Sequence, residues 1–426
     1  MDRDYTSEVY LELVSDGFSF PTSLTFDREG TAYVAEAGLP FAGAPSGGRV
    51  WQLGREGERT LLLEGLRPPV NGLTYHDGAL YISEGGHPGR ISRLEASGEH
   101  RVILNNLPGP GNYHTNMVAF GPDGKLYFSQ GAMTNTGIVG LDAYELGWLR
   151  RLPHAHDLPG YDIVLSGINV ETPNPLKQEE GARTRTGAFV PFGTATEPDQ
   201  HIPAQLPCTA AVMRCNPDGS DLELVAWGLR NAYGLGFLPD GRLLATDQGA
   251  DDRGSRPVGN APDLLYEVRE GAWYGWPDFI GGVSVTDERF RPERGLAPTF
   301  LLANHEELPS PEPARLEFAP HAAATKFDVA PPGTAYAGQL VVALFGDEAP
   351  MTGPSGPRVG RRVVRVDPAD WSLHPVVKGL LVRPIDVRFG RGAEALYILD
   401  FGHFEMTEGG GLETDPTGGR LWRYAL

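Results

Sequence analysis

The chain has 426 residues, and its 55 Asp and Glu against 36 Lys and Arg give a formal net charge of −19. This acidic balance argues against a nucleic-acid partner, because phosphate binding requires clustered Lys and Arg. Hydrophobic residues make up 40% of the chain, enough for a packed core, and 56 Gly with 37 Pro favour a turn-rich β-fold over a helical one.

The start of the chain, residues 1–5, has neither the basic nor the apolar segment of a signal peptide. No run approaches the roughly 20 apolar residues that a membrane span requires. We therefore expect a soluble protein without a membrane span. Its compartment is the cytoplasm if the chain has no leader, and the periplasm or the extracellular space if a leader has been trimmed.

One phrase recurs along the chain: apolar alternation, a turn of the Asp-Gly kind, and a second β-rich run, which together are typical of a hairpin. The copies span residues 23–36, 71–84, 116–129, 233–246, 326–344 and 385–400. Further strands are expected at 48–53, 89–94, 211–214, 264–268, 362–366 and 419–424. Six such units predict one all-β domain over residues 1–426, a six-bladed β-propeller of four-stranded antiparallel blades.

The third unit is interrupted by a long insertion. Equivalent positions in the first four copies lie 49, 45 and 117 residues apart, at Leu24, Leu73, Val118 and Leu235. The excess predicts an insertion over residues 132–207, and we expect it to cap one mouth of the propeller, because loops of this length in compact domains usually serve function.

The two cysteines, Cys208 and Cys215, are too few for a disulfide scaffold, and we favour buried thiols over a single disulfide. His154 and His156 form a pair of the zinc-binding kind, but in a Pro-rich insertion such a pair is more often incidental. The chain has no Gly-x-Ser-x-Gly elbow, phosphate-binding Gly-rich loop or Cys-x-x-Cys pair. These absences disfavour serine hydrolases, nucleotide-binding enzymes and thioredoxins.

Two segments carry a resemblance to a known family. The first, residues 114–127, reads His-Thr-Asn-Met-Val-Ala-Phe-Gly-Pro-Asp-Gly-Lys-Leu-Tyr. The second contains Gly-Leu-Arg-Asn at 228–231, Thr-Asp-Gln-Gly-Ala-Asp-Asp at 246–252 and Gly-Ala-Trp-Tyr-Gly-Trp-Pro at 271–277. In both, the chain resembles the glucose/sorbosone dehydrogenases, six-bladed propellers whose characterised members use pyrroloquinoline quinone (PQQ) with calcium.

The resemblance implies an oxidoreductase that oxidises a sugar or a related alcohol or aldehyde, passing hydride to PQQ and electrons onward to a quinone or cytochrome. His114 matches the family's catalytic base, a role that suits a histidine titrating near neutral pH. The matched cofactor-binding residues are Arg230, Asn231, Gln248, Asp252 and Arg383, and the matched calcium-binding positions are Gly249 and Ala250. Three of these groups also have a structural interpretation: a capped turn for the histidine, an inter-blade pair for Arg230 and Asn231, and a solvated acidic turn for Asp247, Asp251 and Asp252.

The chain departs from the family at three cofactor contacts. A second family arginine falls on Ile385, a glutamine falls on Val70, and the lysine that meets the quinone falls near residues 357–362. Arg358 and Arg361 are the candidates to replace that lysine, although Arg and Lys are not equivalent. A cofactor with three negative charges would lose part of its site.

Two other functions stay open, because one fold hosts many activities. A metal-dependent, lactonase-like hydrolase needs side-chain ligands from several blades, and the candidates at comparable strand ends are Glu36, Glu84, Asn116, Asp247 and Asp400. A non-catalytic binding propeller would use the mouth and the insertion to recognise a partner.

Overall fold

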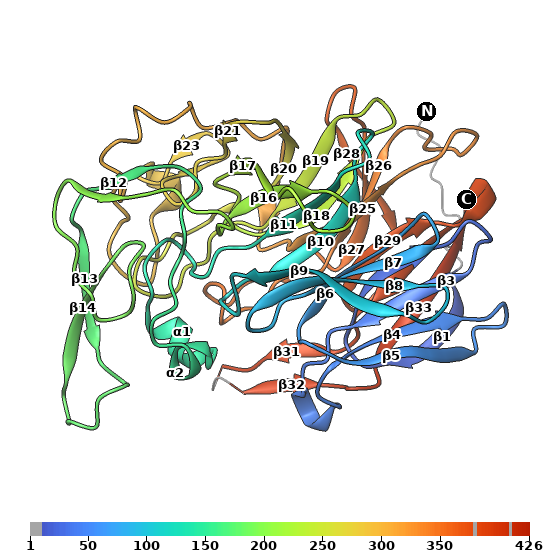
Figure 1. Cartoon of the computed structure of the whole chain (residues 1–426), viewed down its shortest axis with the longest axis horizontal. Helices are drawn as coiled ribbons and strands as arrows, with labels where there is room; N and C mark the ends of the chain where they lie inside the picture. Colours follow the sequence, from blue (N-terminus) through green and yellow to red (C-terminus); the bar gives the residue numbers. More distant parts are fainter. Residues whose placement is uncertain (1–10, 378–380, 409–410) are drawn as a thin grey trace.

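The computed structural model describes residues 11–377, 381–408 and 411–426. Residues 1–5, on which the prediction about a signal peptide depends, lie outside the described residues. Six sheets surround a common centre (Figure 1). Their innermost strands contact one another in a closed ring, in the order β2, β6, β10, β18, β25, β29 and back to β2. The predicted six-bladed β-propeller is confirmed.

Every predicted hairpin forms the two inner strands of a blade, followed by two outer strands. Blade one contains β2 (Pro21–Phe26), β3 (Ala32–Glu36), β4 (Gly48–Leu53) and β5 (Arg59–Leu66), and blade two contains β6 (Val70–His76), β7 (Ala79–Glu84), β8 (Gly89–Glu95) and β9 (His100–Leu107). Blade three contains β10 (Thr115–Phe120), β11 (Leu126–Gln130), β16 (Ala211–Cys215) and β17 (Glu223–Trp227), with β21 (Ala272–Trp273) added in parallel.

The remaining blades follow the same plan. Blade four contains β18 (Ala232–Phe237), β19 (Leu243–Asp247), β20 (Pro262–Val268) and β24 (Leu316–Pro320), and blade five contains β25 (Ala324–Val329), β26 (Leu340–Leu344), β27 (Arg362–Val366) and β28 (Leu373–Val377). Blade six contains β29 (Pro384–Phe389), β30 (Ala395–Asp400), β33 (Gly419–Ala425) and, outermost, β1 (Leu11–Phe18). Because β1 pairs with β33, the two ends of the described chain close the ring within one sheet.

The insertion predicted in blade three lies between β11 and β16. It contains α1 (Leu141–Glu145), α2 (Trp148–Arg151), β12 (Ile163–Leu165), β13 (Asn169–Pro173), β14 (Arg183–Gly187) and β15 (Gln200–Ile202). The buried Asp157 carboxylate joins its two ends, since it accepts hydrogen bonds from the backbone of Met133 and Thr134 and from the hydroxyl of Thr209. The hairpin of β13 and β14 projects from one side of the ring (Figure 1). Its role as a cap stays a prediction.

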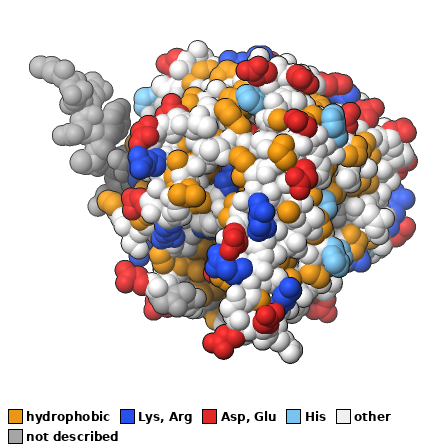
Figure 2. Space-filling view, turned by 90° about the vertical axis from the view of Figure 1, so that its left-hand side faces the viewer, with side chains coloured by type: hydrophobic (Ala, Val, Ile, Leu, Met, Phe, Trp, Pro, Cys, Tyr) orange, Lys and Arg blue, Asp and Glu red, His pale blue; other side chains and the backbone are white. Residues whose placement is uncertain are grey.

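Shorter elements complete the chain. They are η1 (Phe41–Gly43), β22 (Phe279–Ile280), β23 (Val283–Ser284), η2 (Glu288–Phe290), η3 (Arg391–Ala393), β31 (Phe404–Met406) and β32 (Leu412–Thr414). Cys208 and Cys215 are buried free thiols, as expected. On the face seen from the insertion side, acidic and basic side chains are interspersed (Figure 2). None of the described helices is long and apolar enough to cross a membrane.

Candidate functional site

A cavity of about 490 Å³ lies at the end of the ring where all six inner strands begin. The second residue of each inner strand lines it, one from every blade: Thr22, Asn71, Asn116, Tyr233, Thr325 and Ile385. Because the six strands start at the same depth, these side chains converge from positions far apart in sequence. The volume is in the range of pockets that hold small organic ligands.

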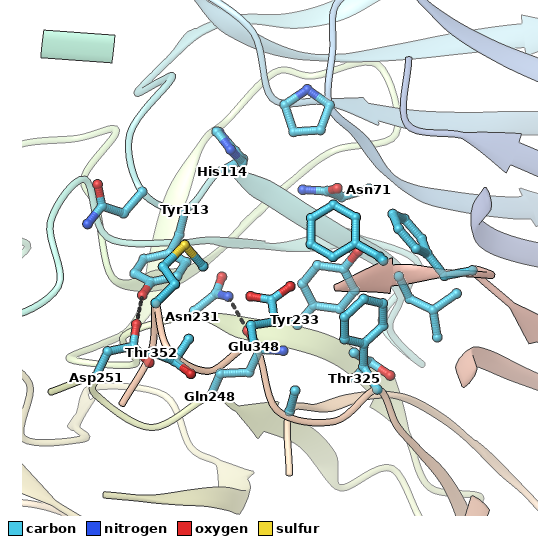
Figure 3. A pocket seen from close by; sticks show the side chains of 18 of the residues that line it. Asn71, Tyr113, His114, Asn231, Tyr233, Gln248, Asp251, Thr325, Glu348 and Thr352 are labelled. Carbon is cyan, nitrogen blue, oxygen red and sulfur yellow. Dashed lines mark hydrogen bonds between the residues drawn. The ribbon is translucent and has the colours of Figure 1, made fainter. Parts of the chain in front are cut away.

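One side of the cavity is a chain of hydrogen-bonded amides, of which Figure 3 shows the link between Asn231 and Gln248. Asn71 donates to the side-chain oxygen of Asn116 at 3.2 Å, Asn116 donates to Asn231 at 2.8 Å, and Asn231 donates to Gln248 at 2.8 Å. The amide nitrogen of Gln248 ends the chain, with no partner among the described residues, so it is available to donate to a ligand. Side chains of this kind suit hydroxyl groups.

His114 lies beside this chain, one residue before β10, and lines the cavity. Its Nδ1 atom is buried and has no hydrogen-bond partner in the part of the chain that the structure describes. Burial lowers the pKa of the imidazole to about 4, partly opposed by the backbone of Gly85. The ring is therefore neutral at physiological pH and can accept a proton, but a pKa this low makes it a weaker base than the near-neutral histidine expected from the sequence.

We expect the ring of His114 to titrate near pH 4 in the folded protein, which NMR would measure as the histidine signal missing from His114→Gln. An unfolded histidine titrates near pH 6.5. The unfolded state therefore holds the extra proton between these values, and the stability that His114 contributes is complete above about pH 6.5 and is lost as the pH falls towards 4. A titration midpoint near 6.5 in the folded protein would contradict this.

Arg230 is almost fully buried, and its guanidinium forms hydrogen bonds and an ion pair within the protein. It donates to the backbone oxygens of Asn135 and Gln248, each at 3.1 Å, and pairs with Asp251 at 2.8 Å. Arg253 pairs with the same carboxylate at 3.0 Å. These are the only Lys or Arg side chains among the described residues that line the cavity.

The opposite side of the cavity is apolar and comes from blades one, five and six. It consists of Leu39, Phe41, Phe345, Ile385, Phe401, Phe404, Met406 and Leu412. No sequence pattern predicts this wall, because β31 and β32 form an extra hairpin between strands of blade six and follow no repeat. Leu146, between α1 and α2, is the residue through which the described part of the insertion lines the same cavity.

Glu348 also lines the cavity and carries no motif signal. It follows β26 in a Gly-Asp-Glu-Ala-Pro loop of the most degraded repeat, and its side chain lies beside Asn231 and Tyr233 (Figure 3). No described residue hydrogen-bonds to its carboxyl group, and burial raises its pKa, partly opposed by the charges of Arg383 and Arg253. The cavity is therefore lined by a carboxyl group without a hydrogen bond from the described residues.

The structure brings together five of the residues singled out from the sequence: His114, Arg230, Asn231, Gln248 and Gly249 all line the cavity.

Three others lie elsewhere. Arg383 is fully buried behind the wall and donates to the backbone of Gly346, Asp347 and Phe404. Asp252 accepts from the backbone of residues 293–294, and Ala250 is packed in the core of blade four.

The substitutes proposed for the family lysine do not reach the cavity. Arg358 and Arg361 both pair with Glu405, at 2.9 and 2.6 Å. Val70 is buried in the core between blades one and two. The loss of a lysine at this position is therefore not compensated from these arginines.

The five candidate ligands for a hydrolytic metal do not converge. Glu36, Glu84, Asp247 and Asp400 each accept hydrogen bonds from backbone N–H groups that precede an inner strand, at Ser19, Arg67, Arg230 and Arg383, respectively. Only Asn116 of this set lines the cavity. The described residues contain no group of three or more His, Cys, Asp and Glu placed to hold a metal ion. These carboxylates shape the blade entrances instead.

No protein-family model and no curated protein matches the chain. Solved structures do. The PQQ-bound aldose sugar dehydrogenase of Streptomyces coelicolor is 16% identical, with a TM-score of 0.58 and 98% of each chain covered. The holo PQQ domain of the pyranose dehydrogenase of Coprinopsis cinerea is 13% identical, with a TM-score of 0.57, covering 98% of this chain and 97% of that one.

The soluble aldose sugar dehydrogenase of Escherichia coli, in its apo form, is 12% identical, with a TM-score of 0.55, covering 98% of this chain and all of that one. The chain has the fold of these sugar dehydrogenases. The fold that the two motifs implied is therefore confirmed.

The cavity does not offer what PQQ requires. A cofactor with three carboxylates needs free cations, but Arg230 and Arg253 are both paired with Asp251. Ile385 replaces one expected arginine, and Glu348 adds a negative charge. For calcium, the carboxylate in contact with Gly249 is that of Asp263, which already accepts hydrogen bonds from the backbone of Gly249 and Ala324. The described residues fit neither group as the resemblance implies.

Proposed function

We propose that the cavity is the active site of an oxidoreductase that acts on a hydroxyl group of a sugar or a related alcohol, with His114 as the general base. The observation that carries this proposal is a neutral, half-buried His114 beside the amides of Asn116, Asn231 and Gln248 in the central cavity. The shared fold with dehydrogenases of sugars supports the class of reaction.

Oxidation of an alcohol removes the hydroxyl proton and a hydride from the carbon. His114 accepts the proton, while the amide chain holds neighbouring hydroxyl groups by hydrogen bonds. The hydride passes to a two-electron acceptor of the quinone class, which is reduced to the hydroquinone and must be bound as a second molecule. PQQ with calcium is the acceptor that the sequence resemblance implies, but the described residues of the cavity provide no unpaired arginine or lysine for its carboxylates.

The test is dye-linked oxidation of a panel of sugars, amino sugars and alcohols, with and without added PQQ and calcium. We expect His114→Ala to lower kcat by about 10²- to 10⁴-fold, the usual contribution of a general base. His374→Ala, at an exposed site, is the matched control and should keep full activity. Absence of oxidation under every condition, or full activity in His114→Ala, would overturn the proposal.

A second candidate is a binding propeller without catalysis, which the loss of free cations around the cavity favours. It predicts ligand binding without oxidation in the same panel. The hydrolase is less well supported, because its candidate carboxylates are bonded to backbone N–H groups.

A further inference from the structure

We propose that the cavity binds a small organic cation, an amine with an apolar body, and that Glu348 is its counter-ion. This deepens the proposed function by naming a substrate class, an amino alcohol or amino sugar whose hydroxyl group meets His114. This inference rests on the proposed oxidoreductase function only for the oxidation of the bound compound, because binding of the cation can be measured without turnover.

The charges of the cavity carry the first step. Three carboxyl groups line it, from Asp251, Asp263 and Glu348. Asp251 is paired with two arginines, and Asp263 accepts two backbone hydrogen bonds. Glu348 is the lining carboxylate without a partner among the described residues. Because an unpaired charge in a partly buried site is costly, a cationic ligand gains more there than in water.

The aromatic wall supplies the second step. The rings of Phe345 and Phe401 lie 5.3 Å apart, edge to face, and Phe401 lies 5.7 Å from Phe404. The guanidinium of Arg383 already lies over Phe345, at 4.8 Å from its centre. Phe401 and Phe404 have no such cation among the described residues, and aromatic faces attract ammonium groups within about 6 Å.

The site of Glu348 in Figure 3 joins these two features. Its side chain lies near the ring of Tyr233, in the cavity that the amides and the phenylalanine rings also line. An ammonium group bound in this cavity can therefore meet both a carboxylate and aromatic faces. A carboxylate at the same place contacts a like charge, so the same arrangement rejects anions.

The experiment compares choline with 3,3-dimethyl-1-butanol, which has the same shape without the charge. Calorimetry of the full chain at mildly alkaline pH should show choline binding about tenfold more tightly or better, as expected for a partly desolvated cation beside a carboxylate and aromatic rings. Glu348→Gln should abolish this preference. Glu306→Gln, which removes an exposed carboxylate, should keep it.

Three results would overturn the inference: equal binding of the two compounds, no binding of either, or a preference that persists in Glu348→Gln. A circular dichroism spectrum and urea midpoint of Glu348→Gln equal to those of the wild type show that the variant is folded. His114→Ala should retain the choline preference. Retained preference without oxidation of any compound refutes only the proposed function, and oxidation of neutral sugars without the preference refutes only this inference.

Discussion

Lys326→Met is expected to lower the free energy of unfolding by about 2 to 5 kcal/mol, because it leaves two buried backbone oxygens without their hydrogen-bond donor. Lys326 is fully buried on β25, and its ammonium group donates to the backbone oxygens of Thr22 and Asn71. One side chain of blade five thereby holds the inner strands of blades one and two across the centre of the ring. Both oxygens would lose this donor in the variant.

Urea unfolding followed by tryptophan fluorescence measures the change. The matched control is Lys177→Met, at an exposed position of the insertion, which should change the free energy by no more than about 0.5 kcal/mol. If Lys326→Met unfolds at the same urea concentration as the control, the ammonium group does not hold the blades together.

The repeats made the fold predictable, because each inner hairpin is local. Strict alternation interrupted by Asp-Gly encodes strand, turn and strand within about 14 residues, and the register follows from the turn. The closure by β1 was not predicted, since its partner β33 is about 400 residues away and no local signal connects them. The hairpin of β31 and β32 was also missed, because it interrupts a repeat instead of extending one.

The candidate site was predictable only where a motif marked it. His114, Asn231 and Gln248 belong to such motifs, and the structure places them around one cavity. Arg383 also matched by position, but a matched position does not determine where a long side chain points. Glu348 has no motif, and only the ring geometry brings its loop beside blade four.

Arg230→Met is expected to destabilise the protein by about 3 to 5 kcal/mol, because it leaves the buried Asp251 with less compensation. The guanidinium joins the insertion to blade four through Asn135 and Gln248, and it is buried away from solvent. If Arg230 were instead held ready for a ligand, its loss would weaken binding and leave unfolding unchanged. Urea unfolding and calorimetry with PQQ, an anionic ligand, on the same sample separate these two roles.

Arg230→Lys sharpens this test. Lysine keeps the charge beside Asp251 but cannot donate in the planar fork that reaches both backbone oxygens, so we expect a stability loss smaller than that of Arg230→Met. Arg101→Met, at an exposed site, is the control and should unfold like the wild type. If Arg230→Met unfolds at the same urea concentration as the wild type, Arg230 is free for a ligand. A cofactor with carboxylates would then again suit this cavity. A large loss of stability instead means that Arg230 serves the fold and that its charge is paired with Asp251. Glu348 is then the unpaired charge of the cavity among the described residues.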